Sequence, residues 1–137
     1  MIVLLLCAFC GLMAFIMAII LQFSIPSWLF FAGLSRMKTE DLANIEVPRL
    51  RRRLSILMYL LSAFFFTGAI LFYIKNISYM LLLPLLQGAV LLVFNGFWFC
   101  YRRFDHNRYP SRVLRAAFIF WVCANLFFLL PLVFYIF

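Results

Sequence analysis

Charged residues are scarce in this sequence. They make up 12% of its 137 residues, whereas roughly a quarter is usual in a soluble domain. Only four residues are acidic and one is histidine, while 69% are hydrophobic. A soluble fold of this size could not cover so much apolar surface. The composition therefore excludes an ordinary soluble domain and fits a chain that is surrounded by lipid.

The long apolar runs, such as residues 54–74, also lack any alternation of apolar and polar residues. Inside a bilayer every backbone N–H and C=O must be satisfied, so only helices or a closed barrel can cross it. The strands of a barrel would alternate apolar and polar side chains. The sequence therefore predicts an all-α polytopic membrane protein, a bundle of four transmembrane helices that forms a single domain.

Four apolar runs define the expected spans, at about residues 2–23, 54–74, 79–100 and 116–136. At ~1.5 Å per residue, about 20 residues cross a hydrocarbon core of ~30 Å. The first run has neither a basic leader nor a convincing cleavage site, so we expect a retained span instead of a signal peptide.

Two polar segments, at about residues 26–53 and 101–115, separate the first span from the second and the third from the fourth. In the first of them we expect a short helix that is capped by Thr39, with Glu40 and Asp41 at the positive end of its dipole.

Basic residues are concentrated in these two polar segments, and only Lys75 lies on the other side. Since positively charged loops stay in the cytoplasm, both segments should be cytoplasmic and both termini should lie outside it. This distribution is typical of orientation signals and contacts with lipid headgroups, and it argues against nucleic-acid binding in spite of the net charge of +8. The arginines that we expect to contact anionic lipid or an acidic partner are Arg51, Arg52, Arg53, Arg102, Arg103 and Arg108.

No charged residue falls within an expected span, which argues against a pump or a proton-coupled transporter. Thr67, Gln87 and Asn125 lie at similar depths in the second, third and fourth spans. We expect Gln87 and Asn125 to hydrogen-bond across the third and fourth spans, with Thr67 nearby. The alternative is that these three residues line a polar substrate site or an uncharged transport pathway.

The first span carries small residues at spacings of four, three and four, which places them on one face of a helix. Small residues let helix backbones approach closely, so we expect this face to pack against another helix of the same chain or of a partner. The residues are Cys7, Gly11, Ala14 and Ala18.

The sequence predicts no catalytic site, no cofactor and no metal site. Cys7 and Cys10 form a C-x-x-C pair, but a thiol in hydrocarbon is disfavoured as the reactive thiolate. His106 has no Cys, His or carboxylate neighbour of the kind that a metal site needs, so we interpret it as a solvated loop residue. No nucleophile and base, zinc motif or acidic cluster accompanies them.

The segment 33–41 resembles a loop of uncharacterised small bacterial membrane proteins and, more remotely, of SdpI-type immunity proteins. The matched residues are Gly33, Met37, Glu40 and Asp41, while Leu34 and Ser35 stand where tyrosine and asparagine are usual. The family usually has three spans, and this chain has four expected ones. The resemblance implies a bacterial inner membrane and, by analogy, an immunity role.

Composition and resemblance together lead to one functional expectation. The chain is a non-enzymatic small integral membrane protein that contacts membrane lipids and binds another membrane protein, as an immunity protein or accessory subunit, or a second copy of itself. A small transporter or channel component with an uncharged polar pathway is the alternative.

Overall fold

The computed structural model describes residues 1–23, 29, 34, 37–75 and 78–136, and in this part of the chain it is helical without strands. Among the described residues, four helices are long and apolar enough to cross a membrane, so the predicted all-α fold with four helices of spanning length is confirmed. The described helices are α1 (Ile2–Gln22), α3 (Thr39–Ala43), α4 (Val47–Lys75), α5 (Tyr79–Phe104) and α6 (Ser111–Ile136).

The spanning helices extend further toward the basic segments than the apolar runs indicate. The helix predicted from residue 54 begins at Val47, because apolar positions continue at Leu50 and Leu54 on one face while arginines, which are good helix formers, occupy the others. Pro48 lies in the first turn, where proline is tolerated. Similarly α5 ends at Phe104 and α6 begins at Ser111. Most of the arginines expected in loops therefore lie on helix ends.

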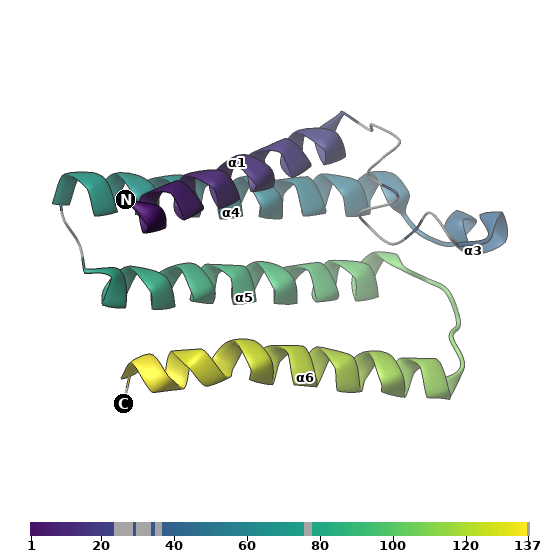
Figure 1. Ribbon diagram of the computed structural model, residues 1–137. Coiled ribbons are helices and arrows are strands. Elements are labelled where there is room, and N and C mark those ends of the chain that lie inside the picture. Colours follow the sequence, from purple (N-terminus) through teal and green to yellow (C-terminus); the bar gives the residue numbers. More distant parts are fainter. Residues whose placement is uncertain (24–28, 30–33, 35–36, 76–77, 137) are drawn as a thin grey trace.

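Each long helix packs mainly against its neighbour in the sequence, α1 on α4, α4 on α5 and α5 on α6, so that the helices form a row (Figure 1). The start of α1 and the end of α6 lie at the same end of the long helices. The other end carries α3, the connection 105–110 and all the described arginines, and we name it the arginine end. Over Ser111–Val133, α6 has no buried residue, so it is the most exposed helix of the row.

The predicted stripe of small residues lies at the contact between α1 and α4. Two serines of α4 donate hydrogen bonds across this contact, Ser55 Oγ to the carbonyl of Ala18 at 3.0 Å and Ser62 Oγ to the carbonyl of Gly11 at 2.9 Å. Such bonds need the close backbone approach that small side chains permit. The buried residues of the stripe are Cys7, Gly11, Ala14 and Ala18.

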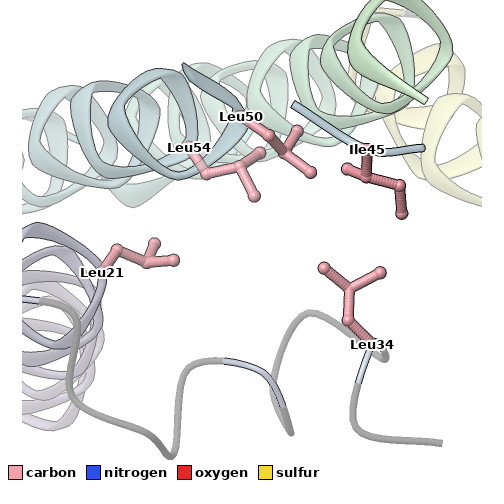
Figure 2. Close-up of a cluster of buried hydrophobic side chains, with 5 residues drawn as sticks. All are labelled: Leu21, Leu34, Ile45, Leu50 and Leu54. Carbon is pink, nitrogen blue, oxygen red and sulfur yellow. The ribbon is translucent and has the colours of Figure 1, made fainter. Parts of the chain in front are cut away.

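A cluster of buried side chains lies between the helices at the arginine end (Figure 2). Leu50 and Leu54 of α4 meet Leu21 from the end of α1, together with Ile45 and Leu34 from the connecting segment. Partly buried aromatic residues of α5 pack against the same cluster. It therefore joins three long helices at the point where the connections between them run.

The short helix α3 is present, but its predicted cap is wrong. Lys38 takes the N-cap position and no side chain caps the helix, because Thr39 is already its first helical residue. Glu40 and Asp41 do lie in the first turn, where the helix dipole favours carboxylates.

Candidate functional site

The two connections at the arginine end are tied together by backbone hydrogen bonds. The amide of Glu46 donates to the carbonyl of Phe104 at 3.0 Å, and the amide of His106 donates to the carbonyl of Asn44 at 3.1 Å. These bonds flank an antiparallel bridge between Ile45 and Asp105. The segment before α4 and the segment after α5 therefore form one unit, which we name the loop junction.

Asn107 connects the loop junction to α3. Its Nδ2 donates to the carbonyl of Asp41 and to Oδ1 of Asp105, both at 2.8 Å, and its Oδ1 accepts from Nδ2 of Asn44 at 3.1 Å. The side-chain amide thus uses both its donor and its acceptor groups. It fixes the position of α3 relative to the α5–α6 connection.

Tyr109 anchors the end of this connection, because its hydroxyl donates to Oδ2 of Asp105 at 2.7 Å. Burial, followed by this hydrogen bond to a carboxylate, raises the pKa of Tyr109 to about 12. The hydroxyl therefore stays neutral and serves as a donor at any physiological pH.

Glu46 is the acceptor for two basic side chains. Nη1 of Arg49 lies 2.6 Å from one carboxylate oxygen, and Nε2 of His106 lies 3.0 Å from the other. The hydrogen bond to His106, and then the contact with Arg49, hold the pKa of Glu46 below its ordinary value. The interpretation of His106 as a solvated residue is therefore incomplete: it is exposed, but it is paired with a carboxylate from the other connection.

A groove of about 890 Å³ lies between α4 and α5 beside the loop junction, and we name it the arginine groove. Its basic side chains come from the first turns of α4 and the last turn of α5. Two exposed apolar residues, Ile56 and Phe99, lie at its membrane side. The residues that give it its chemistry are Arg49, Arg52, Arg53, Arg103 and Glu46.

On the other side of α5, a pocket of about 630 Å³ opens between α5 and α6. Its wall is mainly aromatic and apolar, with Trp98 and Phe118 among the lining residues, and Arg102, Arg115 and Asp105 are its charged members. Asp105 is already engaged by Tyr109 and Asn107.

The six arginines that were expected to contact lipid or a partner therefore lie in different surroundings. Arg52, Arg53 and Arg103 line the arginine groove, while Arg102 lines the aromatic pocket. Arg51 is half-buried and Arg108 is exposed on the α5–α6 connection. The structure thus brings together only three of the six arginines that the sequence singles out.

The amides in the spans join α5 to α6, although Gln87 and Asn125 do not bond to each other. Nε2 of Gln87 donates to the carbonyl of Phe128 at 2.6 Å. Asn125 instead accepts from Nδ2 of Asn95 at 2.7 Å, and Oδ1 of Asn95 accepts from Nε1 of Trp121 at 3.0 Å. The remaining donors bond to carbonyls one turn earlier in the same helix.

Thr67 lies apart from these amides. It is exposed on α4, in a shallow groove of about 220 Å³ between α4 and α5 that neither Gln87 nor Asn125 lines. The expectation of three polar residues at one place is therefore not met, because Thr67 faces away from the α5–α6 contact. We name this hollow the small-residue groove, after Ala63, Thr67 and Gly68.

Several polar residues in the spans were not predicted to pair. Asn95 is central to the α5–α6 contact, and the signal for it is an amide in an otherwise apolar run, like that of Gln87. Ser55 and Ser62 are seven residues apart, as are their partners Gly11 and Ala18. This matched spacing is a signal from which the antiparallel pairing could have been found.

Among the residues that carry the family resemblance, Gly33 and Ser35 lie outside the described residues. Met37 is half-buried against the cluster at the arginine end, and Leu34 belongs to that cluster. Asp41 contributes its carbonyl to Asn107.

The cysteines are free thiols in the described part of the chain, with Cys7 buried on α1 and Cys123 exposed on α6. The same part contains no group of three or more His, Cys, Asp or Glu residues that could hold a metal ion. No protein-family model, curated protein or solved structure matches the chain. Its function is therefore inferred from its own residues.

Proposed function

We propose that this protein is a non-enzymatic integral membrane protein that binds a helix of another membrane protein in the small-residue groove, as an immunity protein or accessory subunit. The arginine end faces the cytoplasm and both termini lie outside it, in keeping with the positive-inside rule. The bacterial inner membrane is the compartment that the resemblance of segment 33–41 favours.

The observation that carries this proposal is the hollow surface between α4 and α5 at membrane depth. Ala63 and Thr67 are exposed there, and the buried Gly68 beneath them lets α5 approach α4. Exposed leucines, Leu60 and Leu85, stand at its sides. In lipid, helices associate where small residues permit close packing and where a hydroxyl can bond across the contact. In this groove a partner helix can pack closely against small residues and can hydrogen-bond to the hydroxyl of Thr67.

The same geometry makes the transport alternative less favourable. A pathway needs polar groups that are available to a substrate, but the side-chain amides of Gln87, Asn95 and Asn125 are engaged in hydrogen bonds between or within α5 and α6. Thr67 lines a separate groove. The amides of the spans are thus engaged in helix packing, which favours the proposed role over transport.

The test is purification of the tagged protein from native membranes in mild detergent, with Ala63→Leu as the variant and Cys123→Leu as the control. Both substitutions enlarge an exposed side chain in a span, but only Ala63 lines the groove. We expect a stoichiometric membrane protein to accompany the wild type and the control, and its recovery to fall about tenfold with Ala63→Leu, the effect of losing roughly 1.4 kcal/mol of binding.

Two results would overturn the proposal: the absence of any stoichiometric partner, or equal recovery with Ala63→Leu and Cys123→Leu. If a partner is recovered, the growth of cells that lack this protein distinguishes an immunity protein from an accessory subunit. Killing by a membrane-active toxin indicates an immunity protein, whereas loss of the partner's own activity indicates an accessory subunit.

A further inference from the structure

The arginine groove holds more positive charge than the protein itself neutralises. Among the described residues, four guanidinium groups line it and Glu46 is its only carboxylate. That carboxylate is already occupied by Arg49 and His106. In the described part of the chain, Arg52, Arg53 and Arg103 make no ion pair, so three like charges from two helices face one groove.

Like charges in one groove repel each other unless an anion lies between them. Arginine is well suited to this task, because its planar fork of N–H groups binds the oxygens of a phosphate in pairs. The groove lies between the first turns of α4 and the last turn of α5, where opposite ends of two helix dipoles meet, so the guanidinium groups decide its charge. Its charge therefore complements a phosphate group.

The lining changes character in the direction of the membrane. Ile56 lies about one turn beyond Arg52 along α4, and Phe99 lies one turn before Arg103 along α5, so both are ~6 Å further into the spans. Their side chains are 45% and 63% exposed. A soluble anion would gain nothing from these surfaces, whereas hydrocarbon chains attached to the phosphate would cover them.

We propose that the arginine groove is a binding site for one anionic phospholipid. The phosphate lies between Arg52, Arg53 and Arg103, and the acyl chains run along Ile56 and Phe99. This site is separate from the small-residue groove, since Ala63 is ten residues beyond Arg53, or ~15 Å along the helix. The inference goes beyond the proposed function and does not depend on it, because no partner protein is needed.

The experiment is native mass spectrometry of the full-length protein in neutral detergent, with added phosphatidylglycerol as the anionic lipid and phosphatidylcholine as the zwitterionic one. A micelle of neutral detergent has no charged surface, so retention reports a defined site. We expect one phosphatidylglycerol to be retained per chain in preference to phosphatidylcholine. The variant Arg52→Gln/Arg53→Gln/Arg103→Gln should lower its affinity by about a hundredfold, at roughly fivefold per arginine.

The matched control is Lys38→Gln/Arg112→Gln/Arg115→Gln. It removes the same net charge from exposed residues at the same end of the molecule that do not line the groove. We expect its affinity for phosphatidylglycerol to stay within about threefold of the wild type, since these residues are outside the site. Should the groove variant fail to fold, Arg103→Gln alone provides the test, with an expected loss of about fivefold.

Four outcomes would overturn the proposal. They are equal retention of both lipids, an equal loss in the two triple variants, release of the lipid by millimolar inorganic phosphate, and displacement of the lipid by an acidic peptide. The last two would make the groove a site for a soluble anion or for an acidic protein segment. Recovery of the partner protein should not change with the triple variant of the arginine groove. Failure of the lipid proposal is therefore distinguishable from failure of the proposed function.

Discussion

The hydroxyl of Ser62 donates a hydrogen bond of 2.9 Å to the backbone carbonyl of Gly11, at a point where both residues are buried between α1 and α4. Seven residues away along each helix, Ser55 makes the equivalent bond to Ala18. Two such bonds along one antiparallel contact fix the register of the helices, because sliding α1 along α4 would break both of them.

Replacing Ser62 with alanine should destabilise the fold by about 1 kcal/mol, the usual scale of a side-chain hydrogen bond between membrane helices. The measurement is reversible unfolding in mixed micelles with increasing dodecyl sulfate, followed by circular dichroism. Thr67→Ala is the control, because this exposed hydroxyl does not lie between α1 and α4. Equal unfolding midpoints for the two variants would contradict a role for the Ser62 bond.

Replacing Gly11 with alanine should also destabilise the α1–α4 contact. A Cβ atom at Gly11 would lie 3.3 Å from Cβ of Phe65 and 3.3 Å from the ring of Phe66, and Cβ of Phe65 cannot move without its backbone. We expect a loss of about 1–2 kcal/mol, which is typical of an overpacked site.

The control for Gly11 is Gly88→Ala on α5, where a Cβ atom would meet nothing within 4 Å. That substitution should be neutral or stabilising by up to about 1 kcal/mol, because alanine favours a helix more than glycine does. The same unfolding assay distinguishes the two. Closely similar effects of both alanines would show that close packing at Gly11 is unimportant.

The sequence predicts the four spans well, because a run of about 20 apolar residues has few alternatives in a membrane. It predicts their ends at the arginine side poorly. The arginines predict a basic loop at residues 49–53, yet Leu50 is fully buried and belongs to the same helical face as Leu54. Long arginine side chains on a helix end can extend toward water, so charge alone does not end a helix.

The candidate sites depend on contacts between distant segments, and these are mostly outside the reach of one sequence. The bridge between Ile45 and Asp105 joins two connections that nothing in the local sequence marks as partners. The arginine groove likewise forms only because α4 and α5 bring Arg53 and Arg103 together. The small-residue stripe of α1 is different, because its periodicity by itself defines a face.

The contact between α5 and α6 should depend on the pair Asn95 and Asn125. Replacing Asn125 with leucine removes the hydrogen bond that Nδ2 of Asn95 donates to α6 and leaves only the bond from Trp121 to Asn95, so we expect a loss of about 1 kcal/mol. Replacing both asparagines should cost less than the sum of the single changes, because each single change already breaks the one hydrogen bond that the two amides share. A double-mutant cycle in the unfolding assay measures this coupling, and strictly additive effects would argue against it.

The loop junction should weaken as the pH falls, through the titration of Glu46. The hydrogen bond from His106 and the contact with Arg49 lower the pKa of Glu46 below its ordinary value of 4.5, so the folded state favours the ionised carboxylate. The contribution of Glu46 to stability is therefore complete above pH 4.5 and is lost as the pH falls below this value, through the folded-state pKa. Unfolding midpoints measured between about pH 6 and 3 should thus fall more steeply for the wild type than for Glu46→Gln, which has no proton to take up.

Glu40→Gln serves as the control, because Glu40 is exposed on α3 and makes no ion pair in the described part of the chain. Its midpoints should follow the wild type, and parallel curves for the wild type and Glu46→Gln would show that this carboxylate does not hold the two connections together.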